Sequence, residues 1–276
     1  MAGAPAPRGR LSDPSPGPAR PTGTVPMRSD PWELARSKAA ASGVSLRALT
    51  RVADADAILD VMIATWGEHQ LLPREVIVAL VESGNVPWGA FDGDELVGYV
   101  LGWAGVSTDD GLHLHSHMLA ARPERRHRGV GYALKLAQRA QALDQGIGVV
   151  RWTFDPLLAR NAHFNLTKLG AVGDRFGRDF YGEMTDTLNR GERSDRLVVR
   201  WDLEREPGPR AVEPGATVRI PEDHLALRGK DPEDAAAWRD RVAEALEAHL
   251  EAGLVAAGFD RGRSAYLFAP AGEVVP

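Results

Sequence analysis

The stretch LHLHSHMLAARPERRHRGVGYALKLAQRA, residues 112–140, joins two different sequence patterns at a glycine-containing turn. Its first half alternates histidine with other residues at His113, His115 and His117, and alternation of this kind is typical of a β-strand. Its second half repeats apolar residues at helical spacing, with Gly146 where the helix would end. We therefore expect a strand over residues 111–121 and an amphipathic helix over residues 131–145.

The turn between them carries Gly129 and Gly131. A backbone without Cβ atoms can approach a ligand closely, and the N–H groups at a helix start form a site for phosphate oxygens. Leu134 stands where the dinucleotide-binding fingerprint has its third glycine, and no Gly-Lys-Ser/Thr run of a Walker loop follows. The pattern alone leaves phosphate binding and an ordinary turn both open.

The flanking segments predict alternating helices and strands. Asp92-Gly93-Asp94 lies between two β-rich runs and is a strong hairpin signal. Asp54 or Asp56 is placed to cap a helix that ends near Trp66. The remaining expected elements are helices from Pro31, over 73–82 and over 161–169, strands over 44–49 and 149–154, and one later strand. This order predicts a mixed α/β domain.

Composition excludes several classes of protein. The chain has 276 residues, 43% of them hydrophobic, a formal net charge of -5 and no cysteine. The lack of cysteine excludes disulfides, thiolate catalysis and cysteine-ligated zinc. The negative net charge gives the chain no overall electrostatic attraction to nucleic acid or to an anionic membrane. No apolar run approaches the ~20 residues of a membrane span, and no secretory signal is recognisable. We expect a cytoplasmic protein without nucleic-acid or membrane partners.

The two ends of the chain differ from its middle. Residues 1–30 are rich in Pro, Ala and Gly and are expected to be a disordered tail. A main domain is predicted over 31–204, followed by a linker over 205–215. Residues 216–276 predict a small extension of strand, helix and two strands, with Asp231-Pro232 starting the helix. Too small to be stable alone, it should dock on the core or on a partner subunit, which leaves a homodimer possible.

The turn RRHRGVG and the preceding LHSHMLAARPE resemble the acetyl-CoA signature of the GNAT N-acetyltransferases, [QR]-x-x-G-x-[GA], carried here by Arg126, Gly129 and Gly131. The resemblance extends over about 44–203, and WTFDPLLARNAHFNLTKLGA and SDRLVVRW are similar to a poorly characterised GNAT subgroup. It implies the GNAT fold, a mixed central β-sheet flanked by helices. It also implies transfer of an acetyl group from acetyl-CoA, or of another acyl group from its CoA thioester, to a primary amine of a small molecule or peptide.

The resemblance assigns cofactor contacts to three segments. The turn would hold the CoA pyrophosphate, the strand end at Leu119 to Ala121 would pair with pantetheine, and Asn161 and Asn165 would lie nearby, with Asn161 either contacting pantetheine or capping the short helix. The turn residues are Arg126, Arg128, Gly129, Val130, Gly131 and Tyr132.

The histidines provide candidate bases. Strict alternation would place His113, His115 and His117 on one face, together with Leu119 and Ala121. By resemblance, His115 occupies the position of the glutamate base of histone acetyltransferases, and His115 with His117 resembles the histidine pair of arylalkylamine N-acetyltransferases. An imidazole with a pKa near 6.5 can accept the proton of an attacking amine. A metal site, for which no third ligand is identifiable, and a polar cleft lining are the alternatives.

One position departs from the family pattern. Leu166 stands where many members carry the tyrosine that protonates the leaving thiolate, and Gly170-Ala171 replaces Gly-Phe. Tyr181 is a candidate acid from a later loop. Three other functions stay open: a CoA-binding regulatory module without turnover, transfer of a longer acyl group or to a hydroxyl acceptor, and a histidine-based metal enzyme.

Overall fold

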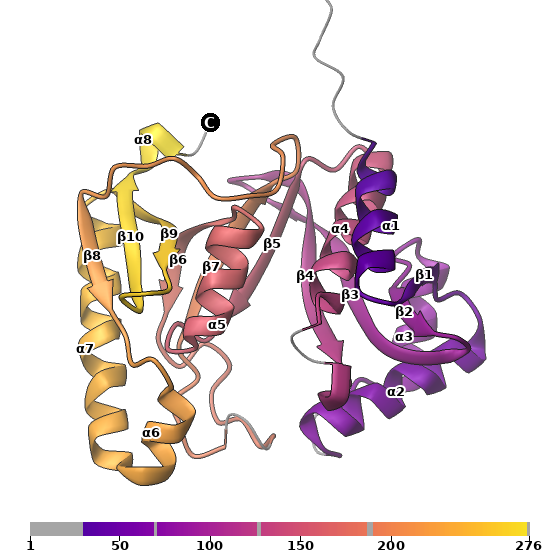
Figure 1. Ribbon diagram of the computed structural model, residues 1–276, viewed down its shortest axis with the longest axis horizontal. Coiled ribbons are helices and arrows are strands. Elements are labelled where there is room, and N and C mark those ends of the chain that lie inside the picture. Colours follow the sequence, from indigo (N-terminus) through magenta and orange to yellow (C-terminus); the bar gives the residue numbers. More distant parts are fainter. Residues whose placement is uncertain (1–29, 69–70, 126–127, 187–189, 275–276) are drawn as a thin grey trace, which may run out of the picture.

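The computed structural model describes residues 30–68, 71–125, 128–186 and 190–274, which form a mixed α/β fold around one central sheet. Within these residues ten strands lie in the order β1-β2-β3-β4-β5-β7-β6-β9-β10-β8 (Figure 1). Of the paired neighbours, only β4 and β5 run parallel. The strands are β1 (Ser45–Ala48), β2 (Trp88–Asp92), β3 (Glu95–Ser107), β4 (Gly111–Ala121), β5 (Val149–Phe154), β6 (Val172–Gly177), β7 (Arg196–Asp202), β8 (Ala216–Arg219), β9 (Leu254–Asp260) and β10 (Ala265–Pro270). The predicted α/β class is confirmed.

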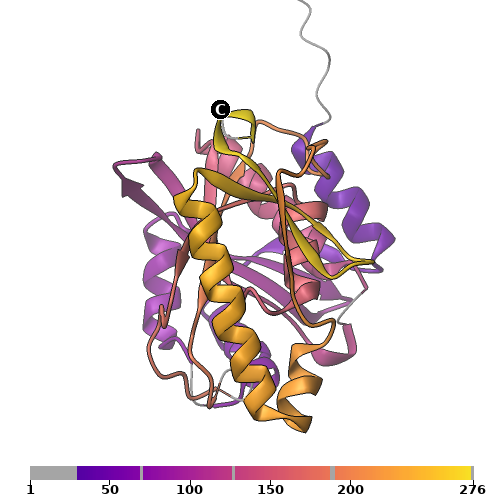
Figure 2. The ribbon, with the colours of Figure 1, turned by 90° about the vertical axis from the view of Figure 1, so that its left-hand side faces the viewer.

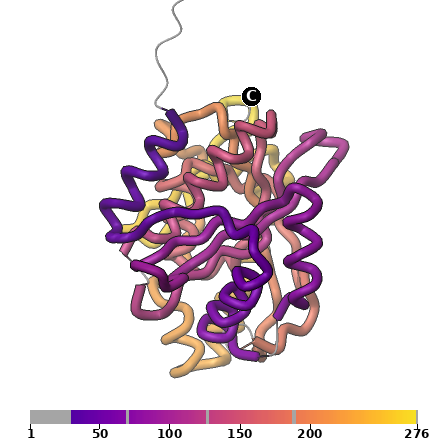
Figure 3. Tube along the Cα trace, turned by 90° about the vertical axis from the view of Figure 1, so that its right-hand side faces the viewer, coloured from indigo at the N-terminus to yellow at the C-terminus, as the bar shows by residue number. Residues whose placement is uncertain are grey.

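Helices cover both faces of the first four strands. On one face, α1 (Pro31–Ala41) packs on α4 (Val130–Asp144), which contacts β2, β3 and β4. On the other face, α2 (Val52–Trp66) and α3 (Arg74–Glu82) bury Ile58, Met62 and Ile77 against Tyr99 and Leu101 of β3. Figure 3 shows α1 and α2 on opposite sides of β1. Strand β4 thus contacts a helix on each face, α2 on one and α4 on the other.

The start of α2 differs from its prediction. The residue that precedes the helix is Arg51, and Asp54 is the third residue inside it. The Asp54 carboxylate accepts the backbone N–H groups of Thr50 at 3.0 Å and Arg51 at 2.9 Å, and it pairs with the guanidinium groups of Arg47 and Arg51. Asp54 thus caps the helix from within its first turn, because a carboxylate there can reach back to the free N–H groups.

The second half of the sheet contains one more strand than the sequence predicts. After β5, the short helix α5 (Ala159–Ala162) continues as a π-helical segment, η2 (His163–Lys168), and ends before Gly170, whose φ is +75°. Two antiparallel strands follow, β6 and β7, where one was expected. Strand β6, VGDRFG, lacks a regular alternation because it contains two glycines and a register shift between Gly173 and Arg175.

The C-terminal extension continues the same sheet. Strand β9 contacts β6 through the pair Gly173 and Ala256, and β10 and β8 follow outward. Asp231 caps α7 (Pro232–Glu251) as predicted, whereas α6 (His224–Lys230) was not expected; α8 (Ala271–Val274) ends the described chain. Figure 2 shows α7 running along this end of the molecule. No helix within the described ranges combines the length and apolarity needed to cross a membrane.

Candidate active site

The parallel strands β4 and β5 separate soon after they meet. They pair only at Leu114 with Val150 and at His115 with Arg151, and beyond these residues they diverge (Figure 1). Among the described residues, no strand pairs with this edge of β4 from Ser116 to Ala121. An open strand edge presents backbone donors and acceptors to an extended ligand.

A β-bulge at His117 reverses the faces of β4. Leu101 of β3 lies opposite Met118 and Gly102 lies opposite Ser116, so His117 is the extra residue. A bulge of this kind leaves one residue outside the ladder and re-aims the side chains beside it.

The bulge corrects one expectation from the sequence. Leu119 and Ala121 pack with Val130 and Leu134 of α4, whereas His115 lies beside Trp103 on the opposite face. The histidines therefore do not share a face with Leu119 and Ala121, because the alternation is broken at His117.

Two of the three histidines form a cluster with Trp103. The Trp103 ring centroid lies 5.1 Å from that of His115 and 4.8 Å from that of His117, and the two imidazoles are 5.8 Å apart. His113 is placed differently, with Nδ1 3.1 Å from the carbonyl oxygen of Gly111 and its ring over Gly105. The structure thus brings together His115 and His117, and Trp103 is a neighbour that the sequence did not reveal.

Both clustered imidazoles are neutral at pH 7. Burial lowers the pKa of His115 to about 4, assisted by the charges of His117, His113 and Lys135, and burial also lowers the pKa of His117. Neutral imidazoles retain a lone pair, so either ring can accept a proton.

Tyr181 lies at the other side of the diverging strands. Its hydroxyl is 3.0 Å from Oγ1 of Thr153, which follows the last paired residue of β5 by two positions. The ring packs edge-on against Phe180, and the Arg196 guanidinium lies 5.5 Å from its centroid. The loop between β6 and β7 therefore delivers Tyr181 to the open part of β5.

The glycine turn opens α4 as the sequence predicts. Gly129 precedes the helix with φ +91°, and a Cβ there would lie 2.5 Å from Oγ of Ser42 at the end of α1. At Gly131 a Cβ would meet only Cδ2 of Leu119, at 3.6 Å. The chain itself thus requires glycine at position 129 but not at position 131.

The other predicted turn residues differ in accessibility. Arg126 lies outside the described residues, and Arg128 is exposed. The Val130 side chain is 1% exposed and belongs to the core, which leaves only its backbone for a ligand. The Tyr132 ring is partly buried, and Nζ of Lys168 lies 5.1 Å from its centroid.

The two asparagines and Leu166 lie on α5 and the π-helical segment η2, which follow β5. Asn161 is the third residue of α5 and does not cap it, because Leu158 precedes the helix. Asn165 is 5% exposed and accepts a hydrogen bond from Nε1 of Trp152 at 3.2 Å. Leu166 is fully buried in the core. The side-chain oxygen of Asn165 is thus engaged inside the protein, and its cofactor contact stays a prediction.

Lys135 of α4 is a buried cation that the sequence did not single out. Its Nζ donates to Oγ of Ser116 and Oε1 of Gln138, both at 2.9 Å, and lies 3.8 Å from the Trp152 ring centroid. No carboxylate in the described residues pairs with it, and burial lowers the Lys135 pKa well below its usual value. Lys135 thus fills the space between Ser116 and Trp152, where β4 and β5 begin to part.

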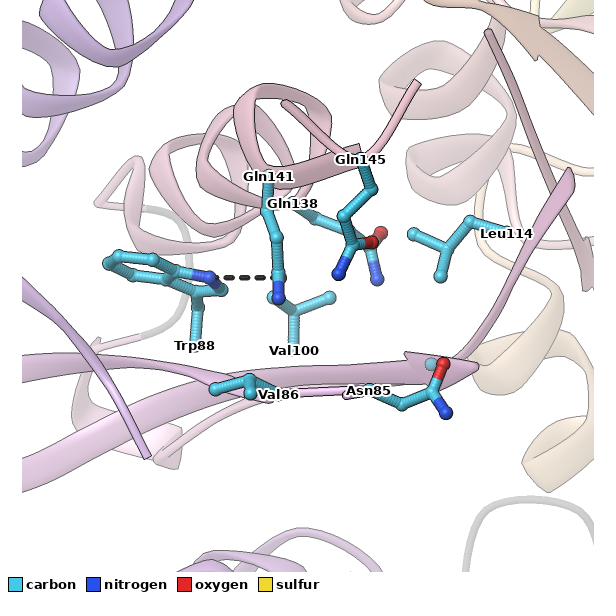
Figure 4. Close-up of a pocket in the computed structure, with 9 residues that line it drawn as sticks. Asn85, Val86, Trp88, Val100, Leu114, Gln138, Gln141 and Gln145 are labelled. Atoms are coloured by element: carbon cyan, nitrogen blue, oxygen red, sulfur yellow. Dashed lines mark hydrogen bonds between the residues drawn. The ribbon is translucent and has the colours of Figure 1, made fainter. Parts of the chain in front are cut away.

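A small cavity lies between α4 and the sheet, beside β2 and β3 (Figure 4). Gln138, Gln141 and Gln145 line it from α4, and Asn85 lines it from the segment before β2. It has room for about one water molecule. The cavity lies on the α4 face of the sheet and the histidine cluster on the opposite face, so the cavity is not part of that cluster.

A buried ion network closes the sheet where β4 and β5 meet. Arg151 donates to Asp174 at 2.7 Å and pairs with Asp110 of the β3–β4 turn, which also accepts from Arg200 at 3.0 Å. Burial opposes ionisation of Asp110, but the hydrogen bonds and charges of Arg151 and Arg200 lower its pKa overall. No sequence motif indicated this network, because its members come from four separate segments.

Comparison with known proteins identifies the domain. Residues 56–170 match the model of the acetyltransferase (GNAT) family. A comparison with curated protein sequences finds no match. Within the described residues, no three His, Asp or Glu side chains are grouped as a metal site.

Three solved structures illustrate the structural similarity. The ribosomal-protein-S18-alanine N-acetyltransferase from Escherichia coli is 12% identical over 59% of this chain and 96% of its own, with a TM-score of 0.48. Naa20 from Chaetomium thermophilum, in complex with a bisubstrate analogue, is 19% identical over 62% and 94%, with a TM-score of 0.48. The yncA protein from Salmonella typhimurium, solved with its cofactor acetyl-CoA, is 15% identical over 61% and 99%, with a TM-score of 0.46. The family match thus identifies an acetyltransferase (GNAT) domain within residues 56–170 of this chain.

Proposed function

We propose that this protein is an acetyl-CoA-dependent N-acetyltransferase that moves an acyl group from CoA to a primary amine by direct attack, with His115 or His117 as general base. The observation that carries the proposal is the pair of neutral imidazoles at the bulge of β4, beside an open strand edge and next to a glycine turn that starts a helix. The family match supports the same reaction class.

The turn and the strand edge fit a CoA thioester. The backbone N–H groups from Arg128 to Gly131 would hold the pyrophosphate, since the first N–H groups of a helix have no partner within it. The surroundings of Gly131 support this assignment. A Cβ atom there would meet only Leu119, at an ordinary contact distance, so packing within the chain does not explain why this residue is glycine. The free edge of β4 at Leu119 to Ala121 would pair with the pantetheine.

The acyl donor supplies a carbonyl carbon activated as a thioester, and the chain supplies the proton chemistry. An amine with a pKa near 10 is about one part in a thousand neutral at pH 7, and only its lone pair attacks a carbonyl. His115 or His117 takes the proton that the amine loses, directly or through a water molecule. The bulge leaves the backbone at His117 outside the ladder, where an N–H group can stabilise developing negative charge on oxygen.

The thiolate of CoA that leaves in the reaction needs a proton. Position 166, where many family members carry a tyrosine for this purpose, is a leucine here. Leu166 has no proton to donate and is fully buried. We assign this role to Tyr181, whose hydroxyl lies at the open part of β5. The acceptor is an amine on a small molecule or a peptide. The solved structures similar to this chain include a ribosomal-protein-S18-alanine N-acetyltransferase and an aminoglycoside acetyltransferase.

The test is thiol release from acetyl-CoA with a panel of amines, for the wild type and for His115→Ala, His117→Ala and their double variant. His113→Ala is the matched control, because His113 lies on the same strand but contacts Gly105 instead of Trp103. We expect the double variant to lose at least 100-fold in kcat/KM and the control to stay within about twofold.

Two outcomes would contradict the proposal. Wild-type rates in the double variant would exclude a histidine base. Tight CoA binding without thiol release from any acyl-CoA, with amine or hydroxyl acceptors, would instead indicate a CoA-binding regulatory module. Thiol release that requires a longer acyl-CoA or an alcohol would keep acyl transfer from CoA as the reaction but change the acyl donor or the acceptor.

A further inference from the structure

The loop between β6 and β7, residues 178–195, is described over 178–186 and 190–195, and these parts are held by the C-terminal extension through ion pairs. Arg178 near its start donates two hydrogen bonds to Glu247 of α7, both 2.7 Å long. Arg193 near its end donates to Asp240 of α7 at 2.8 Å. Helix α7 therefore contacts the loop close to both of its ends.

Glu192 joins the loop to both helices of the extension. Its carboxylate accepts from Nε2 of His224 at 2.9 Å and from Arg228 at 3.1 Å, both in α6, and from Arg239 of α7 at 2.9 Å. Burial opposes ionisation of Glu192, but the His224 hydrogen bond and the Arg239 charge lower its pKa to about 2. Glu192 is therefore ionised at neutral pH and binds three basic side chains from the extension.

Arg239 extends this connection to the central sheet. Its side chain is 4% exposed, and it donates to Asp155, directly after β5, at 3.0 and 3.3 Å. One guanidinium of the extension thus links the loop to the end of the strand that carries Thr153. A buried arginine with two carboxylate partners is costly to displace, so this link has a defined geometry.

The same loop carries Tyr181 to the histidine face of the sheet. Arg151 lies opposite His115, and Thr153, two residues further along β5, points to the same face as Arg151. The Tyr181 hydroxyl contacts Thr153, while its backbone N–H donates to Oγ of Ser194 at 2.9 Å. The glycine turn belongs to the opposite, α4 side, where Leu119 and Ala121 pack.

We infer that the C-terminal extension sets the acceptor selectivity of the site by holding the 178–195 loop, with Glu247, Asp240 and Arg239 as positioning residues. The inference rests on the proposed function, because it assigns the histidine face to the amine acceptor and the α4 face to CoA. It follows that loosening the loop raises the KM of the amine acceptor more than the KM of acetyl-CoA.

The test is a charge exchange between Arg178 and Glu247, whose side chains are each about one-third exposed, so that substitution leaves the core intact. Arg178→Glu and Glu247→Arg, each alone, are expected to raise the acceptor KM at least threefold and to leave the acetyl-CoA KM within twofold. The double exchange should restore the acceptor KM. Arg241→Glu is the matched control, because Arg241 pairs with Asp234 inside α7 and away from the loop.

Hydrogen exchange of the loop amides provides a readout that does not depend on turnover. We expect faster exchange over the described loop residues in both single variants and wild-type exchange in the double variant. Faster exchange with an unchanged acceptor KM and unchanged ranking of acceptors would overturn the inference alone, as would a double exchange that fails to restore either quantity. A wild type without acyl transfer to any acceptor would overturn the proposed function, and the inference with it.

Discussion

Replacing Gly131 by alanine should stabilise the protein and weaken CoA binding at the same time. Gly131 is the second residue of α4, its φ is not positive, and a Cβ there would meet only Leu119, at the ordinary contact distance of 3.6 Å. Glycine inside a helix costs about 0.5–1 kcal/mol relative to alanine, chiefly through the entropy of the unfolded chain. We therefore expect the free energy of unfolding to rise by about 0.5–1 kcal/mol in Gly131→Ala.

The effect on CoA has the opposite sign. A methyl group at position 131 stands where the backbone would approach the pyrophosphate, and a hydrogen bond to a charged acceptor contributes about 1.5–3 kcal/mol. Because 1.4 kcal/mol corresponds to a tenfold change, the Kd for CoA should rise about 10- to 100-fold. Urea denaturation measures the first quantity, and isothermal titration calorimetry with CoA measures the second.

Gly129→Ala is the comparison variant. At φ +91° an alanine costs about 1–2 kcal/mol, and its Cβ would clash with Ser42 at 2.5 Å, so this variant should be less stable than the wild type. If Gly131→Ala also loses stability, glycine is required there for folding. If it gains stability while the CoA affinity is unchanged, the turn does not hold the pyrophosphate, and the reasoning is refuted.

Two further predictions follow from ionisable groups. In His117→Ala, where His115 is the remaining base, the acid limb of the pH profile of kcat/KM should lie below pH 6.5, because protonated His115 cannot accept a proton and burial, the largest cause that lowers its pKa, persists when the charge of His117 is removed. A limb that stays near 6.5 would exclude His115 as the base. Asp54→Asn should lower the free energy of unfolding by about 1 kcal/mol at pH 7, since the charge of Asp54 that pairs with the largely exposed Arg47 and Arg51 is lost. The pairing lowers the Asp54 pKa, so its stabilisation is present above about pH 4 and is lost as the pH falls towards the folded-state pKa; denaturation curves should show the two proteins converging in acid, and a constant difference down to pH 2 would contradict this account.

Local signals predicted the elements whose geometry is fixed by neighbouring residues. Asp92-Gly93 forms the turn between β2 and β3, with Gly93 at φ +57°, and Asp231 caps α7 through a hydrogen bond to the N–H group of Asp234. Gly129 has the positive φ that the strand-to-helix turn requires. Each of these features depends on residues within a few positions of one another.

The parts that the sequence did not predict depend on distant partners. The bulge at His117 has no sequence signature, because the three histidines alternate as they would in a regular strand. Asp110 and Arg200 are 90 positions apart, and their contact exists only once β4, β5 and β7 lie side by side. Lys135 looks like a surface residue of an amphipathic helix, and only the fold encloses it between Ser116 and Trp152.

The order of the ten strands has a consequence for the two ends of the sheet. A strand at the edge of a sheet exposes a row of unpaired backbone groups, and long, apolar edges promote association between chains. Here the terminal strands are β1 and β8, each only four residues long and each with an arginine, Arg47 and Arg219. By placing β9, β10 and β8 beyond β6, the extension moves the outer edge from a six-residue strand to a four-residue one. The sheet thus grows by three strands and still ends on a strand of only four residues at each side, which leaves short outer edges as templates for strand pairing between chains.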